Sequence, residues 1–252
     1  MSANGAALVT GAGKRIGRAI ALDLAAAGWS IAVHHHQSTA EADAVVGEII
    51  AAGGNAAALA ADLSDAQATA TLVGRATDSL GPVTVLINNA SAFERDSITD
   101  LTADLWDTHL DVNLRAPAIL TKSFAAALPD EISGNVINLI DQRVWNLTGE
   151  FISYSVSKVG LWGLTQMTAL ALAPRIRVNG IGPGPVLPSA RQSAADFARQ
   201  CAATPLGRGS SPQEICDAIR YILAAPAMTG QMIALDGGAH LTWKSASGAP
   251  PE

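Results

Sequence analysis

Short apolar runs recur along the chain and alternate with longer stretches in which apolar residues are spaced three and four apart. Uninterrupted apolar runs are typical of buried parallel strands, and the wider spacing is typical of amphipathic helices. The pattern predicts strands at 6–10, 29–34, 55–61, 83–87, 134–140, 177–181 and 231–235. It predicts helices at 16–28, 39–52, 65–80, 154–172 and 212–225, and one that contains 111–113 and runs on to 128.

This alternation predicts an α/β fold, a doubly wound parallel sheet (Rossmann fold) with helices on both faces. The sequence has no internal repeat and no Pro/Ser-rich linker, so we predict a single domain over 1–243 and a frayed tail over 244–252. Ligands of such sheets bind at the carboxyl ends of the strands. The residues that follow each strand are therefore the candidates for a binding site.

Composition narrows the class of protein. A chain of 252 residues with 49% hydrophobic and 15% charged residues can bury a large core. The net charge of −6 argues against a nucleic-acid partner. No apolar run reaches the ~18 residues of a membrane span, and the first residues do not resemble a signal peptide. Cys201 and Cys216 lie in no metal-ligand pattern and fit a reducing compartment, so we expect a cytoplasmic protein without a metal or a membrane partner.

The first predicted strand ends in a glycine turn, Gly11-Ala12-Gly13-Lys14-Arg15-Ile16-Gly17, which leads into a helix. Glycines let the backbone approach a diphosphate, and a helix N-terminus offers free N–H groups and a positive dipole end. Arg15 stands where a middle glycine is usual, and an ordinary tight turn is the alternative interpretation. We assign Gly11, Lys14, Arg15 and Ile16 to a dinucleotide site.

The second predicted strand ends in His34-His35-His36-Gln37-Ser38, and no acid occurs before Glu41. An acid here would bind the adenosine ribose hydroxyls and favour NAD. Imidazoles and a hydroxyl suit a 2′-phosphate, so we predict NADP(H), held by His34, His35, His36 and Ser38. The alternatives are a solvated strand end and a metal-binding tract. A metal is disfavoured because adjacent strand residues point to opposite faces.

Polar residues also follow the third and fourth predicted strands. Asp62, followed by Leu63, could hydrogen-bond the adenine amine or cap the next helix, and both interpretations remain open. Asn89, Ala90 and Ser91 follow the fourth strand, where consecutive asparagines can tie neighbouring loops together. We assign all five residues to the cofactor site.

Later segments offer further candidates. Phe93 is either a face on which a planar ring stacks or a plain hydrophobic plug. Asn113 is unfavourable inside a helix, so a kink or a water site is expected around it. Asp141 follows the fifth strand, and Pro183-Gly184 follows the sixth. The Ala-rich stretch 186–204 has weak helical periodicity, and we interpret it as a mobile substrate lid.

Tyr154 and Lys158 are four residues apart on a predicted helix, which places their Cβ atoms roughly 5–6 Å apart on one face. A phenol beside an ammonium group is a proton donor whose ionised form is stabilised by the neighbouring charge. A surface Tyr near a surface Lys is the alternative. This alternative is less favoured because the preceding part of the chain carries a predicted dinucleotide site.

These residues together resemble the short-chain dehydrogenases/reductases. The glycine turn, Asn88-Asn89-Ala90, Asn113, Tyr154 with Lys158, and Pro183-Gly184 stand where that family carries them, over nearly the whole chain. The resemblance implies that Tyr154 donates a proton, that Lys158 holds the nicotinamide ribose and lowers the pKa of the phenol, and that Asn113 positions a relay water. It also implies a homotetramer.

A narrower resemblance is to the pteridine reductases. The chain shares their Lys-Arg turn, their His-rich strand end and their Asn-Ala-Ser-x-Phe loop, and it has Asp141 where most of the wider family carries Ser. The resemblance implies that a pterin lies between the nicotinamide and Phe93, with Arg15 and Ser91 near the cofactor phosphates and the pterin. Trp243 stands where these reductases end in Arg, which leaves that edge of the substrate site open.

Three functions are consistent with these residues. The first is an NADPH-dependent reductase of a dihydropterin, in which the nicotinamide supplies the hydride. The edge of a dihydropterin is rich in N–H groups, and a carboxylate such as Asp141 could accept hydrogen bonds from it. Its substrate site is Arg15, Ser91, Phe93, Asp141 and Tyr154. The second is an NADPH-dependent reductase of a ketone, a quinone or a 3-oxoacyl thioester, in which Asp141 pairs with Lys158 or caps the following loop. The third is a catalytically silent NADP-binding protein.

Overall fold

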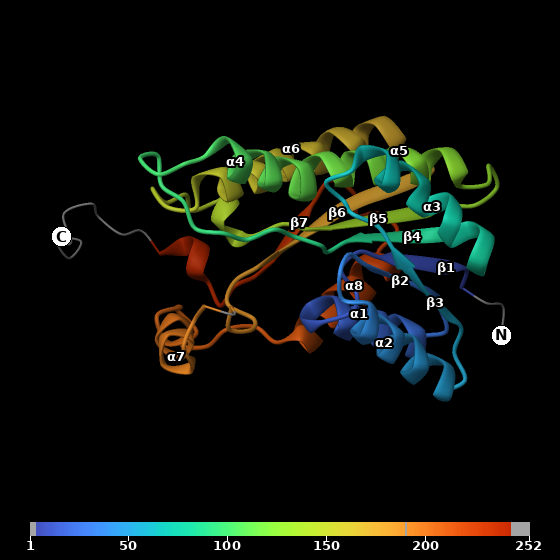
Figure 1. Cartoon of the computed structure of the whole chain (residues 1–252), viewed down its shortest axis with the longest axis horizontal. Helices are drawn as coiled ribbons and strands as arrows, with labels where there is room; N and C mark the ends of the chain where they lie inside the picture. The colour runs from blue at the N-terminus through green and yellow to red at the C-terminus, as the bar shows by residue number, and fades with distance from the viewer. Residues whose placement is uncertain (1–3, 190, 243–252) are drawn as a thin grey trace.

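Seven parallel strands form one sheet in the order β3-β2-β1-β4-β5-β6-β7 within residues 4–189 and 191–242, which the computed structural model describes (Figure 1). The strands are β1 (Ala6–Val9), β2 (Ser30–His35), β3 (Ala56–Ala60), β4 (Val83–Asn88), β5 (Gly134–Leu139), β6 (Ile176–Pro183) and β7 (Met232–Leu235). Trp243 and the predicted tail 244–252 lie outside the described residues.

Helices cover both faces of the sheet (Figure 1). One layer contains α1 (Arg15–Ala26), α2 (Thr39–Ala51) and α8 (Pro212–Ala224). The other contains α3 (Ala66–Leu80), α4 (Ala103–Leu110), α5 (Ala116–Ala127) and α6 (Ile152–Leu172). The predicted doubly wound α/β fold is therefore confirmed. Among the described helices, none is both long enough and apolar enough to span a bilayer.

Each layer has its own hydrophobic core because successive strand residues point to opposite faces. In β1, Ala7 and Val9 pack into the core under α1 and α8, whereas Ala6 and Leu8 pack into the core under α3 and α5. The strand order reverses between β1 and β4, so the helices that follow these strands diverge and leave a crevice at the carboxyl edge. The candidate site lies at this edge.

Two predicted segments differ in detail from a plain helix or loop. The helix expected to run to 128 is broken at Asn113 by a π-helical turn, Asp111–Arg115, which confirms the expected local irregularity. Pro117 lies in the first turn of α5, directly after this π-helical turn. The predicted lid contains one helix, α7 (Ala194–Ala202), whose start is capped by the Ser193 hydroxyl. Short 3₁₀ turns occur at Gln142–Val144 and Ala239–Leu241.

Candidate active site

The glycine turn leads directly into α1 and leaves the helix N-terminus without a side-chain cap. Gly11 has a φ of +63°, a conformation that favours glycine. A Cβ on Gly17 would lie 2.2 Å from the Gly11 carbonyl oxygen, so only glycine fits there. The turn therefore presents uncapped N–H groups at a place where side chains are excluded, which suits an anionic group.

Arg15 has a φ of +54°, which is uncommon for a residue other than glycine. Its guanidinium reaches across the cleft and donates to the carbonyl oxygens of Pro188 at 2.8 Å and Leu187 at 3.2 Å. The turn is thus joined to the start of the predicted lid.

A cavity of about 610 Å³ lies over the glycine turn. Its walls include most of the predicted cofactor residues, namely Gly11, Lys14, Arg15, Ile16, His34, His36, Asp62, Leu63, Asn89, Ala90 and Ser91. Asn89 ties the turn to β4, because its Nδ2 donates to the carbonyl oxygens of Thr10 at 2.8 Å and Gly11 at 3.3 Å. The expectation that asparagines tie these loops together is confirmed.

The histidines divide into two kinds by burial. Strand β2 runs one residue further than expected, so His34 and His35 are both buried. His34 Nδ1 accepts the Gly11 N–H at 3.0 Å, and its Nε2 lies 3.2 Å from the Ala61 carbonyl oxygen. Burial lowers the pKa of His34 to about 4, so the ring is neutral and fixes the turn instead of offering charge.

His36 is exposed and lines the cavity. Its Nε2 lies 3.6 Å from Asp62 Oδ2. His35 lines neither of the two cavities described here, and neither does Ser38, whose hydroxyl lies beside Gly13. His36 and Lys14, which pairs with Glu41, therefore line the part of the cavity predicted to face a 2′-phosphate.

Asp62 does not cap α3, so that alternative is wrong. Asp65 caps the helix, accepting from the N–H groups of Gln67 and Ala68 at 2.8 and 3.2 Å. Asp62 instead accepts from the Ser64 N–H and hydroxyl at 2.8 and 2.7 Å. These hydrogen bonds hold the pKa of Asp62 below its usual range and fix the carboxylate at the wall of the cavity.

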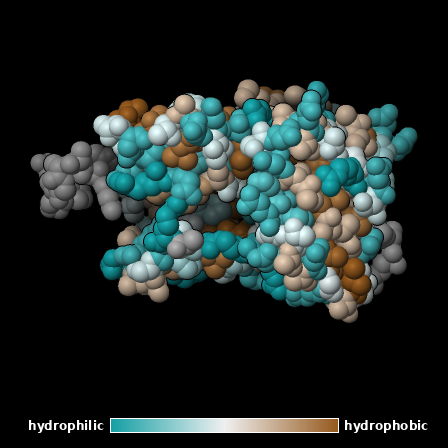
Figure 2. Space-filling model, in the orientation of Figure 1, coloured by the Kyte–Doolittle hydropathy of each residue, from teal (hydrophilic) through white to brown (hydrophobic). Residues whose placement is uncertain are grey.

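A second cavity, of about 710 Å³, continues from the first and shares Arg15, Ile16, Asn89 and Ser91 with it. Figure 2 shows the surface hollowed between α7 and the layer that contains α4. The predicted residues on its walls are Phe93, Asp141, Tyr154, Lys158, Pro183 and Gly184. The candidate catalytic and cofactor residues therefore lie along one cleft.

Asp141 and Tyr154 are hydrogen-bonded inside this second cavity. The Tyr154 hydroxyl donates to Asp141 Oδ2 at 2.8 Å, and Asp141 Oδ1 accepts the Arg143 N–H at 2.8 Å. Asp141 thus caps the next 3₁₀ turn, as one alternative expected, and also contacts the phenol. It does not pair with Lys158, whose Nζ donates to the Leu139 carbonyl oxygen at 2.8 Å.

Burial dominates the electrostatics of these three groups. It raises the pKa of Asp141, and burial together with the charge of Asp141 raises the pKa of Tyr154 well above its usual value. Burial lowers the pKa of Lys158 to about 8. Asp141 acts on the phenol directly because it contacts the hydroxyl, and a lowering of the Tyr154 pKa by Lys158 stays a prediction. Tyr154 is therefore a protonated donor at neutral pH.

Asn113 closes the loop that follows β4. Its Nδ2 donates to the Ala92 carbonyl oxygen at 2.9 Å and to the Ser157 hydroxyl at 3.1 Å, and its Oδ1 accepts the Ala92 N–H at 2.8 Å. These bonds occupy the buried amide and make it a structural link between the loop and α6. A relay water at Asn113 stays a prediction.

Phe93 forms part of a wall of aromatic rings and is not a buried plug. Its ring stacks on Phe151 with the centroids 4.8 Å apart and meets the edge of Tyr154 at 4.7 Å. Sequence reasoning missed Phe151, whose only signal is its place just before the Tyr154 helix. It also missed Gln142 and Arg143, which follow Asp141 and line the cavity.

A buried polar network behind the wall holds both phenylalanines in place. His109 accepts the Glu94 N–H at 3.1 Å through Nε2, and its Nδ1 lies 2.6 Å from the Ser153 hydroxyl. Ser153 also hydrogen-bonds to the Asp96 carboxylate, and the Asp96 carbonyl oxygen accepts the Phe151 N–H at 2.7 Å. Three distant segments are thereby joined beside Tyr154.

Comparison with known proteins identifies the family. The chain matches the family model for short chain dehydrogenases over residues 5–198. It therefore belongs to the short-chain dehydrogenase family of oxidoreductases, as its site residues predicted.

Individual relatives add detail. A 3-oxoacyl-[acyl-carrier-protein] reductase of Synechocystis sp. is 34% identical over 92% of this chain and 95% of its own. The crystal structure of FolM alternative dihydrofolate reductase 1 from Brucella suis, in complex with NADP, is 46% identical, with a TM-score of 0.95 over 99% of this chain and 100% of that one. A short chain dehydrogenase from Burkholderia cenocepacia in complex with NADP is 31% identical, with a TM-score of 0.87 over 93% and 97%.

Proposed function

We propose that this protein is an NADPH-dependent reductase that transfers hydride to the C=N bond of a dihydropterin. The observation that carries the proposal is the hydrogen bond between Tyr154 and Asp141 inside the cleft, beside the Phe93 ring. The Brucella relative supports it, since that protein is described as a dihydrofolate reductase bound to NADP, and dihydrofolate contains a dihydropterin ring.

The cofactor end of the cleft fits NADPH. The uncapped start of α1 and the bare backbone at Gly11 and Gly17 suit the diphosphate. Lys14 and His36 suit the 2′-phosphate. Lys158 faces the same cleft and would hold the nicotinamide ribose. Bound NADPH would supply the hydride.

Reduction of a C=N bond adds hydride to the carbon and a proton to the nitrogen. Tyr154 would donate that proton, since its raised pKa keeps it protonated. Asp141 would then take up a proton from solvent, which its raised pKa favours, and pass it to the phenolate through the existing contact with the hydroxyl. In an alternative orientation, the ionised Asp141 would accept from the N–H groups of the pterin edge.

The test is a substrate comparison combined with Asp141→Ser. We expect the wild-type protein to oxidise NADPH with dihydrobiopterin and dihydrofolate. Asp141→Ser should lower kcat/KM for these pterins about a hundredfold, within the usual range for a proton-transfer group, and leave any ketone turnover within a few-fold. Asp43→Ser, at an exposed position on α2, is the matched control and should change neither. Unchanged pterin turnover in Asp141→Ser would overturn the proposal.

The second candidate is a 3-oxoacyl thioester reductase, which the Synechocystis relative favours. Acetoacetyl thioester belongs in the same substrate panel. If it is the only compound that supports NADPH oxidation, this second function replaces the first. We also carry over the family expectation of a homotetramer, which sedimentation velocity tests directly.

A further inference from the structure

The substrate end of the cleft carries an excess of positive charge. Its described lining residues include four arginines, Arg15, Arg95, Arg143 and Arg191, and Lys158, but only two acids, Asp141 and Asp196. A cavity lined by one sign of charge concentrates ligands of the opposite sign. The question is which of these cations is available to a substrate.

Most of the arginines already have partners within the protein. Arg95 donates to both carboxylate oxygens of Glu150, at 2.9 and 3.2 Å. Arg191 pairs with Glu94 at the edge of the predicted lid. Arg15 donates to two backbone carbonyl oxygens of the segment after β6.

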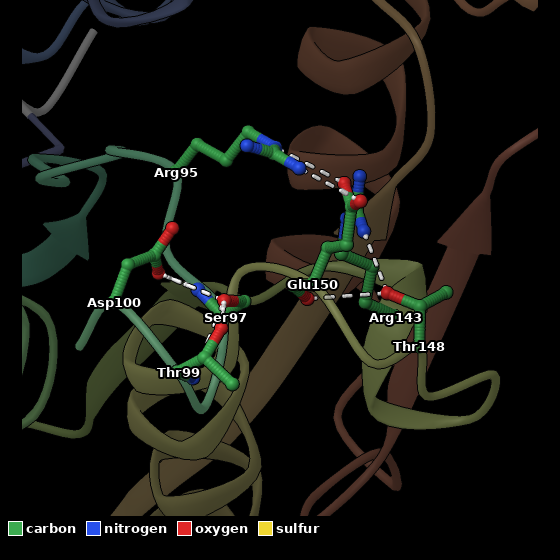
Figure 3. A network of polar contacts seen from close by, with 7 residues as sticks. All are labelled: Arg95, Ser97, Thr99, Asp100, Arg143, Thr148 and Glu150. Atoms are coloured by element: carbon green, nitrogen blue, oxygen red, sulfur yellow. Dashed lines mark hydrogen bonds and ion pairs between the residues drawn. The ribbon is translucent and has the colours of Figure 1, made fainter.

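Arg143 is different from the others. Among the described residues, its side chain has one hydrogen bond, a long one of 3.4 Å to the Thr148 hydroxyl, and no acid within ion-pair distance (Figure 3). Glu150 lies nearby, but both of its oxygens already accept from Arg95. Arg95 and Arg143 thus lie beside one carboxylate, and only Arg95 pairs with it.

The position of Arg143 relates this charge to the reacting groups. Its guanidinium lies over the Phe151 ring, 4.8 Å from the centroid, and Phe151 stacks on Phe93, which touches Tyr154. The backbone N–H of Arg143 is held by Asp141. A line of planar groups therefore runs from the phenol to an unpaired guanidinium.

A dihydropterin carries its side chain on the carbon of the C=N bond that is reduced. The side chain is therefore attached next to the reacting atoms, and Arg143 lies at the end of the row of rings that begins at Tyr154. We propose that Arg143, supported on Phe151, binds a carboxylate on that side chain, so that the protein prefers a dihydropterin with an anionic tail, such as dihydrofolate, to one with a neutral tail. This inference rests on the proposed function and adds the class of its substrate.

The experiment measures kcat and KM for dihydrofolate and dihydrobiopterin in the wild type and in Arg143→Met. We expect Arg143→Met to raise KM for dihydrofolate about tenfold, to keep KM for neutral dihydrobiopterin within about twofold, and to leave kcat unchanged for both. Arg143→Lys should retain part of the preference, because it keeps the charge without the planar fork. Added salt should raise KM for dihydrofolate in the wild type and have less effect in Arg143→Met.

Arg18→Met is the matched control, since this exposed α1 arginine pairs with Glu48 and neither residue lines the two cavities. It should leave both KM values unchanged. Equal changes in KM for the two pterins in Arg143→Met, or no change in either, would overturn the carboxylate subsite while the proposed function stands. A wild-type protein that reduces neither pterin would overturn both.

Discussion

The two ends of the cleft differ in whether backbone or side chains form their surface. At the cofactor end, the surface consists mostly of backbone: the glycine turn, the uncapped start of α1 and the loop after β4. At the substrate end, the surface consists of side chains that converge from separate segments, namely Phe93, Asp141, Phe151 and Tyr154. A backbone surface can serve any substrate, whereas side chains set which molecule is reduced. Cofactor binding therefore depends mainly on the backbone of one end, and the choice of substrate on the side chains of the other.

The strongest test of this difference between the two ends is to remove the Tyr154 hydroxyl. Tyr154→Phe removes the hydroxyl that donates to Asp141 but keeps the ring against Phe93. We expect kcat to fall about a thousandfold, as for the loss of a proton donor, with NADPH affinity unchanged. Stopped-flow NADPH oxidation and a fluorescence titration measure the two quantities. Tyr221→Phe, at the other, exposed tyrosine, is the control and should be fully active.

A change at the cofactor end should instead lower the affinity for NADPH. In Gly17→Ala the new methyl group would lie 2.2 Å from the Gly11 carbonyl oxygen, so the turn must shift. We expect a loss of about 1–3 kcal/mol in the free energy of unfolding and at least a tenfold weaker affinity for NADPH. Gly74→Ala is the control, because Gly74 is an exposed residue of α3 with no atom within 4 Å of its added Cβ.

Gly74→Ala should stabilise the protein by up to about 1 kcal/mol, since alanine favours the helix. Chemical denaturation of the three proteins provides the test. If Gly17→Ala binds NADPH as tightly as the wild type does, the cofactor end does not depend on a bare backbone.

The fold could be predicted because its signals are local. Each buried strand is a short apolar run, and the expected strands lie within one or two residues of most observed boundaries. What the pattern could not predict at β2 is the contact of the His34 ring with Gly11 and Ala61. That contact joins residues far apart in the chain, and no pattern in a histidine run reveals it.

The same contrast between local signals and long-range contacts explains how much of the site could be predicted. Tyr154 and Lys158 follow from spacing on one helix, and Asp141 from its place after a strand. The orientation of Asp141 could not be predicted, because each carboxylate oxygen has a partner in a different segment. Whether Asp62 or Asp65 caps α3 depends on which carboxylate reaches the first N–H groups, a matter of a few ångströms.

The buried His34 and the exposed His36 separate two roles within the cofactor end. Below its ordinary pKa of 6.5, His34 gains a proton in the unfolded chain, but in the folded state it stays neutral down to about pH 4. The unfolded state therefore binds more protons in this window, and the free energy of unfolding should fall as the pH drops from about 6.5 to about 4. His34→Gln should be less stable at neutral pH by about 1–3 kcal/mol and should show a shallower decline.

His36→Gln is the matched variant and should keep the stability profile of the wild type, because His36 is exposed. It should instead weaken NADPH binding a few-fold and leave NADH binding unchanged. Urea denaturation across this pH range and cofactor titrations measure these effects. A loss of stability in His36→Gln as large as that in His34→Gln would contradict the separate roles.

Lys158 lines the cavity at the substrate end, and its titration should affect activity and stability in opposite directions. Its folded pKa is about 8, lowered by burial from 10.5. Above about pH 8 the ammonium loses its charge, so kcat/KM with NADPH should fall by up to tenfold per pH unit. Over the same range the unfolded chain keeps the proton that the folded protein has released, so Lys158 contributes stability that increases with pH until about 10.5. Lys158→Met removes this titration, so the difference in free energy of unfolding between wild type and variant should rise with pH from about 8. A difference that is flat with pH would mean that Lys158 is charged in the folded protein throughout, and that burial does not control it.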